Sequence, residues 1–301
     1  MDTAPQQAST ADQRGTATFG TARLSGSLEG RADNRPPLVL LHGLTFDRRM
    51  WQPAVEALRR RDPGRQVLAL DLPGHGGSPA QASCDLEDVA TAVASAVDDA
   101  GLGEPVIVGH SMAAIVATVF AASYTARGVV SVDQTLDTAF VHMLQTNREA
   151  VIGPGFSKMW PALLSSMRID LLSDDAQRLL STEPPRQDVV LAYWRQALEL
   201  PATEIQSRID QGLAALKQRR VPYMVIASSE YDAAYAAWLR DALPQATLTI
   251  FPSSGHFPHL ADPDRFADCL ASTGQWHAAA PSDPLIAKSV GATEPAAADA
   301  P

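Results

Sequence analysis

The sequence has only two cysteines, and it has no segment that resembles a signal peptide or a membrane span. Cys84 and Cys269 lie far apart in the chain and form neither a disulfide framework nor the spacing of a metal site, so we expect buried, reduced thiols. The stretch 1–16 lacks the apolar region of a secretory signal. The longest apolar run, 113–122, is about half as long as a bilayer crossing requires. These absences predict a cytoplasmic protein that does not contact a membrane.

Positive charge is also scarce. The chain has 24 Lys and Arg residues against 34 Asp and Glu residues, which gives a formal net charge of −10 and an isoelectric point near 5.1. A surface of this sign repels phosphate backbones and anionic lipids. The basic clusters at 59–61 and 217–220 are too short to reverse that balance. We therefore expect a small-molecule substrate as the partner and no nucleic acid.

Motifs that hold nucleotides or metals are missing as well. The sequence has no phosphate-binding P-loop, no Gly-x-Gly-x-x-Gly after an expected strand, and no His-Glu-x-x-His. The glycine-rich stretch 74–77 lacks the lysine and the following helix that a phosphate cradle needs. The expected activity therefore uses no cofactor and no metal.

Hydrophobic residues make up 46% of the chain, enough for a sizeable core. Six short runs rich in β-branched and aliphatic residues are apolar on both faces, as strands of a parallel sheet covered by helices are. They lie at 37–41, 66–70, 105–108, 128–132, 223–226 and 247–251. Helical patterns separate them, so we predict an α/β fold with a mostly parallel, doubly wound sheet.

One interval between strands is much longer than the others. Residues 134–220 consist mostly of helix formers, and a structureless loop of that length is implausible, so we predict an inserted helical cap. The core then comprises 17–133 and 221–277, with disordered segments at 1–16 and 278–301. Five apolar residues of the insert either line a pocket or form its own core: Met159, Trp160, Leu163, Leu164 and Met167.

The strongest chemical motif is Gly109-His110-Ser111-Met112-Ala113, which directly follows the expected strand at 105–108 and directly precedes a helical run. A serine on a sharp strand-to-helix turn presents its hydroxyl clear of its neighbours. The helix that starts there also directs free N–H groups toward developing negative charge. Ser111 is therefore the candidate nucleophile.

With this motif in place, residues 38–270 resemble the α/β-hydrolase family. The segment Leu41-His42-Gly43-Leu44 is similar to the family's His-Gly segment, and the resemblance implies that the backbone N–H groups of Leu44 and Met112 form the oxyanion hole. The stretch 71–78 resembles a structural turn of the family. The family usually has glycine where this chain has Ala113, and a single methyl group is tolerable there.

A serine hydroxyl needs a base within hydrogen-bond reach. His256 is the best candidate, because 254–259 resembles the family's histidine loop and follows the last expected strand, at the sheet edge where Ser111 also lies. The other histidines are assigned structural roles. His110 is expected to point into the fold, His42 and His75 to shape turns, and His259 to pack or to bind water.

The carboxylate that completes the site is ambiguous. The family usually carries it after the strand at 223–226, but Tyr231 occupies the usual position, and Glu230 and Asp232 flank it. Asp133 ends the strand at 128–132, where some family members carry their acid, although an aspartate there can also cap the turn into the insert. We favour Asp232, followed by Asp133 and then Glu230. Each would hold one histidine tautomer and stabilise the imidazolium.

The resulting hypothesis is a hydrolase without cofactor that cleaves a carboxylic ester or a lactone through an acyl-enzyme on Ser111. The same groups can cleave a thioester, an amide or a carbon–carbon bond, which is the first alternative. The second is a ligand-binding protein without activity, because a fold alone does not establish chemistry.

Overall fold

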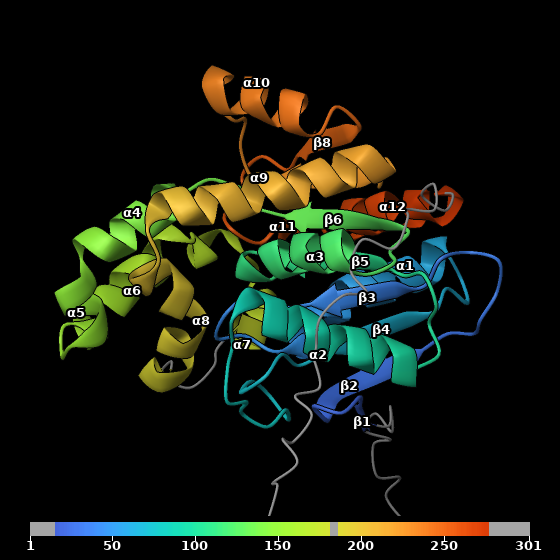
Figure 1. Ribbon diagram of the computed structural model, residues 1–301. Helices are drawn as coiled ribbons and strands as arrows, with labels where there is room; N and C mark the ends of the chain where they lie inside the picture. Colours follow the sequence, from blue (N-terminus) through green and yellow to red (C-terminus); the bar gives the residue numbers. More distant parts are fainter. Residues whose placement is uncertain (1–15, 181–185, 277–301) are drawn as a thin grey trace, which may run out of the picture.

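The apolar runs of the sequence form the strands of one sheet in the computed structural model, which describes residues 16–180 and 186–276 (Figure 1). Within these ranges the sheet has eight strands in the order β1-β2-β4-β3-β5-β6-β7-β8. β1 and β2 pair antiparallel, β2 also pairs antiparallel with β4, and the remaining pairs are parallel. The strands are β1 (Ala17–Phe19), β2 (Leu24–Glu29), β3 (Leu38–Leu41), β4 (Val67–Leu70), β5 (Val106–His110), β6 (Gly128–Val132), β7 (Tyr223–Ala227) and β8 (Ala246–Ile250).

Helices cover both faces of this sheet. One face carries α1 (Gln52–Arg61) and α12 (Pro263–Ser272), with η1 (Arg48–Trp51), α11 (Pro258–Ala261) and η3 (Thr273–Gln275) beside them. The other face carries α2 (Leu86–Asp99), α3 (Met112–Ser123), α9 (Ala202–Arg219) and α10 (Ala233–Ala242). This arrangement confirms the predicted α/β class with a mostly parallel, doubly wound sheet.

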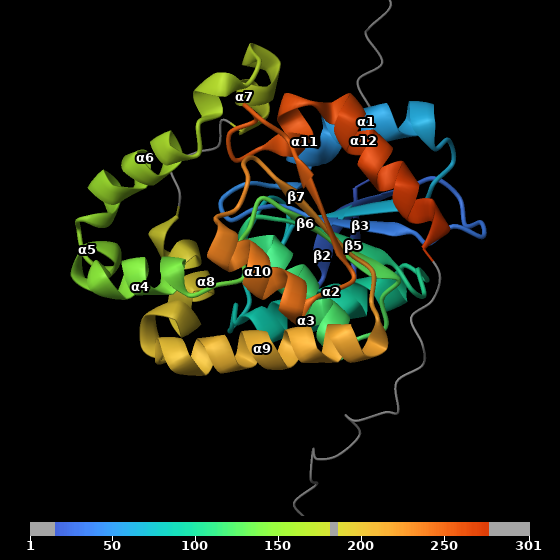
Figure 2. The same cartoon turned by 90° about the horizontal axis from the view of Figure 1, so that it is seen from above.

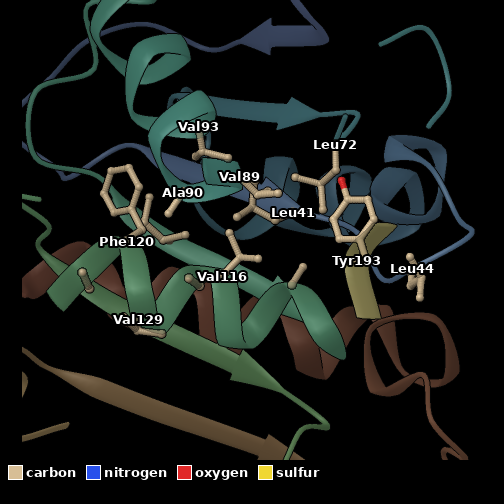
Figure 3. Close-up of a cluster of buried hydrophobic side chains, with 14 of the residues drawn as sticks. Leu41, Leu44, Leu72, Val89, Ala90, Val93, Val116, Phe120, Val129 and Tyr193 are labelled. Atoms are coloured by element: carbon tan, nitrogen blue, oxygen red, sulfur yellow. The ribbon is translucent and has the colours of Figure 1, made fainter. Parts of the chain in front are cut away.

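Because side chains alternate across a strand, each central strand feeds a separate core on each face. In β3, Val39 and Leu41 enter one hydrophobic cluster, and Leu38 and Leu40 enter the other. Figure 3 shows the first cluster, in which valines of α2 and α3 meet over the sheet. Full burial on both faces explains why these runs are apolar throughout rather than alternating.

The long interval after β6 is helical, as predicted. Figures 1 and 2 show most of its helices grouped at one side of the sheet, the side on which the parallel strands end. They are α4 (Ala139–Thr146), α5 (Arg148–Ile152), α6 (Phe156–Ser166), η2 (Ile169–Leu171), α7 (Asp174–Leu180) and α8 (Gln187–Glu199). We call α4–α8 the cap.

α9 differs from the prediction that all of 134–220 forms the cap. It lies along α3 on the face of the sheet (Figure 2), with Leu213 and Leu216 buried in the core cluster. The Arg219 guanidinium donates to the Ala121 carbonyl at 2.7 Å, which fixes the end of α9 against α3. α9 is therefore part of the helical layer that covers the sheet.

Two further predictions concern the ends of the chain and membranes. The predicted tails fall almost entirely outside the described residues, although Thr16 is described and its hydroxyl accepts from the Arg48 guanidinium at 2.8 Å. Across 16–180 and 186–276, no helix is both long and apolar enough to span a membrane.

Candidate active site

Ser111 lies between β5 and α3 in a strained turn. Its φ of 55° and ψ of −133° lie in a region that residues with a side chain seldom adopt. Gly109 allows this turn, because a Cβ at that position would lie 2.1 Å from the Ala113 carbonyl oxygen. Ala113 itself is fully buried, so its methyl group is accommodated in the core. The Ser111 N–H donates to the Val132 carbonyl at 2.9 Å, which fixes the turn to the neighbouring strand β6.

His256 faces Asp133 across the ends of the strands. The His256 Nδ1 atom lies 2.7 Å from Asp133 Oδ2, and the other carboxylate oxygen, Oδ1, accepts from the Ser228 N–H at 2.6 Å. The side chains are 19% and 14% exposed, so both are largely shielded from water. Because a carboxylate only accepts, Nδ1 carries the proton, and the neutral ring keeps its lone pair on Nε2.

The ionisation of Asp133 follows from these contacts. Burial alone would raise the pKa of its carboxyl group. The hydrogen bond with His256, the positive charge of that ring once it is protonated and the Ser228 N–H outweigh burial and hold the pKa below 3.8. Asp133 is therefore a carboxylate at neutral pH.

Asp232, which we favoured as the partner of His256, has a different role in the structure. Its side chain is exposed and caps α10 by accepting from the N–H groups of Ala234 and Tyr235 at 2.9 and 3.0 Å. Glu230 is also exposed. The geometry thus corrects the expected partner from Asp232 to Asp133. The physical reason is the short connection after β7, in which Asp232 is already needed to begin the next helix.

The segments expected to supply the oxyanion hole lie beside these residues in the fold. Met112 is the first residue of α3, where backbone N–H groups have no acceptor within the helix. Leu44 follows the end of β3 and is buried in the core cluster. The next residue, Thr45, has a φ of 70°, and its N–H donates to His75 Nε2 at 3.0 Å.

His42 and His75 hold this loop, as expected of turn-shaping residues. His42 Nε2 accepts from the Leu72 N–H at 2.9 Å, and its Nδ1 donates to the Gly43 carbonyl at 2.8 Å. Burial lowers the pKa of His42 to about 4 and that of His75 to about 3. Both rings are therefore neutral at neutral pH, and each keeps one donor and one acceptor nitrogen.

A contact that the sequence did not predict connects the cap to His256. The His256 N–H donates to the carbonyl of Met167, which follows α6, at 2.8 Å. A second link is the hydroxyl of Tyr193 in α8, which donates to the Pro73 carbonyl at 2.9 Å. Backbone contacts of this kind leave no signature in the sequence, because any residue type can supply the carbonyl.

A partly open apolar cavity of about 150 Å³ lies between α4, α6 and α8 of the cap. It is lined by Met143, Met159, Ala162, Leu163 and Trp194. Of the five apolar residues singled out in the insert, Met159 and Leu163 thus line a pocket, whereas Trp160 is buried and stacks on Phe156. A larger cavity of about 210 Å³, between β2 and α1, contains none of the expected site residues.

The described residues contain no group of three or more His, Cys, Asp or Glu side chains that could hold a metal ion. The side chains that the structure brings together at this edge of the sheet are the His256 imidazole and the Asp133 carboxylate, beside the turn that carries Ser111.

Comparisons with known proteins agree with this fold. A family model described as "Alpha/beta hydrolase family" matches residues 38–269. The chain is 28% identical to a 2-succinyl-6-hydroxy-2,4-cyclohexadiene-1-carboxylate synthase from Serratia proteamaculans, over 79% of this chain and 92% of that protein. It is 26% identical to a pimeloyl-[acyl-carrier protein] methyl ester esterase from Nitrosomonas europaea, over 79% of this chain and 95% of that protein.

Two further matches differ in what they cover. Against a bifunctional biotin biosynthesis protein from Cellvibrio japonicus, the identity is 28% over 85% of this chain, which spans only 51% of that protein's length. Among solved structures, a thermophilic esterase from Thermogutta terrifontis superposes with a TM-score of 0.60. That match covers 88% of this chain and 100% of the esterase at 22% identity, so it supports the fold alone.

Proposed function

The chain belongs to the alpha/beta hydrolase family, and from that premise we propose that it is a serine hydrolase that cleaves a carboxylic ester or a lactone. The observation that carries the proposal is the 2.7 Å contact between His256 Nδ1 and Asp133 Oδ2 at the sheet edge that also holds the strained Ser111 turn. We assign Ser111 as nucleophile, His256 as general base and Asp133 as the acid member of the site.

In the first half of the proposed reaction, Ser111 Oγ attacks the ester carbonyl carbon while His256 Nε2 accepts the hydroxyl proton. The carbonyl electron pair moves onto oxygen, and the Leu44 and Met112 N–H groups stabilise the resulting oxyanion. Asp133 accepts from Nδ1 and stabilises the imidazolium. When the intermediate collapses, the carbon–oxygen bond to the alcohol breaks, and the alcohol takes the proton from Nε2.

In the second half, water replaces the alcohol. His256 Nε2 accepts a proton from the water as its oxygen attacks the acyl carbon, and the same N–H groups stabilise the second oxyanion. Collapse breaks the bond to Ser111 Oγ, which takes the proton back. The products are a carboxylic acid and a regenerated serine, and a lactone gives a hydroxy acid by the same steps.

We assign the cap cavity as the binding site for the apolar part of the substrate, because methionine, leucine, alanine and tryptophan side chains line this cavity. Methionine side chains are flexible and adapt to apolar groups of varied shape. The Nitrosomonas europaea relative is named a methyl ester esterase, which supports ester chemistry. The Serratia proteamaculans relative is named a synthase, which keeps a carbon–carbon bond reaction as the alternative on the same residues.

The test is turnover of p-nitrophenyl acetate and butyrate by the purified chain, with Ser111→Ala as the matched control. We expect turnover by the wild type and its loss in Ser111→Ala at an unchanged melting temperature. A parallel panel of thioesters, anilides and lactones separates the ester proposal from its alternatives. A folded wild type that binds ligands but turns over no substrate in the panel would support a binding protein instead.

A further inference from the structure

His110, the last residue of β5, contacts the loop that carries His256. Its ring is fully buried, and its Nε2 atom lies 2.7 Å from the His256 carbonyl oxygen. Since the carbonyl accepts, Nε2 carries the proton of the neutral ring. The bond joins the strand that ends at the nucleophile directly to the backbone of the base.

The Nδ1 side of the same ring lies against the loop that leads to the oxyanion segment. A Cβ built on Gly43 would lie 2.6 Å from His110 Nδ1 and 3.2 Å from its Cε1. Only glycine therefore lets the backbone before Leu44 approach this closely. His110 Nδ1 is buried without a hydrogen-bond partner in the part of the chain that the structure describes. Among the described residues, the hydrogen bond of the ring is therefore the one that Nε2 makes with the His256 carbonyl.

The ring is enclosed by the histidine loop itself. Its centroid lies 4.7 Å from that of His256, 5.3 Å from Phe257 and 4.9 Å from His259. Burial, followed by the charge of the His256 ring, holds the pKa of His110 well below 6.5. His110 therefore stays neutral when His256 gains a proton, and its Nε2–H remains a donor through both halves of the reaction.

We propose that His110 is a positioning residue that fixes the nucleophile turn, the base loop and the oxyanion loop relative to one another. The inference rests on the proposed function, because it assigns no group that touches the substrate. The His256 peptide is held from two sides: its carbonyl by His110 of the sheet, and its N–H by the Met167 carbonyl of the cap at 2.8 Å. Without the His110 side chain, the hydrogen bond from the His256 N–H to the Met167 carbonyl remains, and the His256 carbonyl loses its donor.

The test compares His110→Phe, which keeps a ring but removes the donor, with His110→Gln, whose amide nitrogen reaches the position of Nε2. We expect kcat on p-nitrophenyl butyrate to fall by about 10- to 100-fold in His110→Phe with little change in KM, as misplacement of reacting groups does. His110→Gln should recover most of that loss.

The matched control is His259→Phe. His259 is equally buried and packs on the same ring, but neither of its nitrogens has a hydrogen-bond partner among the described residues. The His259→Phe variant should keep the kcat of the wild type.

A spectroscopic measurement accompanies the kinetics. It is the low-field proton resonance of the His256 Nδ1–H, identified by its absence in Asp133→Asn. We expect it to weaken in His110→Phe and to persist in His110→Gln and His259→Phe.

A folded His110→Phe with wild-type kcat and an unchanged resonance would overturn the proposal, and so would equal losses in His259→Phe. If His110→Phe does not fold, His110→Asn replaces it, because its shorter amide cannot reach the His256 carbonyl. Equal kcat in the Asn and Gln variants then contradicts a positioning role, and a tenfold advantage of Gln supports it. If the wild type hydrolyses no ester, the proposed function fails, but the resonance still tests His110.

Discussion

Replacing Asp133 with asparagine should abolish most activity while leaving the fold intact. Asp133 Oδ1 accepts from the Ser228 N–H at 2.6 Å, so the asparagine oxygen must remain on that side. Its NH₂ group then faces His256 Nδ1, the atom that donates to Oδ2 at 2.7 Å in the wild type. Two donors cannot share that contact, so the His256 proton moves to Nε2.

The expected size of the effect follows from this change of tautomer. With its proton on Nε2, His256 cannot accept the Ser111 proton, and the comparable change in a serine protease lowers kcat by about 10⁴-fold. That factor corresponds to about 5 kcal/mol of barrier height. KM should change little, because the proposed role of Asp133 involves no contact with substrate.

Asp232→Asn is the control, because asparagine caps a helix as well as aspartate does. It should keep both kcat and the melting temperature, whereas Asp232→Ala should lose about 1 kcal/mol of stability with kcat retained. The assay is kcat and KM on p-nitrophenyl butyrate together with thermal unfolding of each variant. A folded Asp133→Asn within tenfold of the wild type, or an inactive Asp232→Asn, would exclude Asp133 as the functional partner of His256.

Other perturbations test separate parts of the account. Ala162 is exposed on the wall of the cap cavity. Ala162→Trp should fill part of that cavity and lower kcat/KM for p-nitrophenyl octanoate at least about tenfold more than for p-nitrophenyl acetate. An equal loss on both esters would contradict the assignment of this cavity to the substrate. Tyr193→Phe removes the hydroxyl that donates to the Pro73 carbonyl and should lower the free energy of unfolding by about 1 kcal/mol. An unchanged denaturation midpoint would mean that the hydrogen bond between Tyr193 and Pro73 is dispensable for stability. The pKa of Asp133 lies below 3.8 in the folded state. Its carboxylate therefore stabilises the fold above that pH, and this stabilisation is lost as pH falls through the lowered pKa. Asp133→Asn should flatten the acid limb of a plot of melting temperature against pH, and an identical limb in both proteins would count against the Asp133–His256 pair. Prolonged EDTA treatment should leave turnover unchanged, and a loss that added Zn²⁺ restores would contradict the metal-free mechanism.

The strands and the turn that carries Ser111 could be predicted because their signals are local. β3, β5 and β6 are each buried on both faces, which a run of four or five apolar residues already indicates. The Ser111 turn combines a preceding strand, a following helix and small residues within one short stretch of chain. Such features depend on neighbours in the sequence and very little on the rest of the fold.

The carboxylate that pairs with His256 could not be chosen from sequence, because the choice depends on loop geometry. Asp133 and Asp232 both follow strands that end at the same sheet edge. Which of them reaches His256 is decided by the few residues between β7 and α10, where starting the helix already requires Asp232 as its cap. Local capping and long-range pairing compete for the same residue type, and the sequence carries no sign of the outcome.

The assignment of α9 and the contacts of His110 show the same limit. The apolar face of α9 predicts that the helix is packed, but the pattern does not indicate whether its neighbour is the cap or α3. His110 was expected to point into the fold, and it does. Its contacts with Gly43 and His256 join three segments that are remote in sequence, so only the structure brings them together.

Covalent catalysis by Ser111 can be measured by intact-mass spectrometry after incubation of the protein with a fluorophosphonate. We expect one label per chain, located on Ser111 by peptide mapping, with none in Ser111→Ala and much slower labelling in Asp133→Asn. A folded wild type that takes up no label, or takes it up at another residue, would contradict the account.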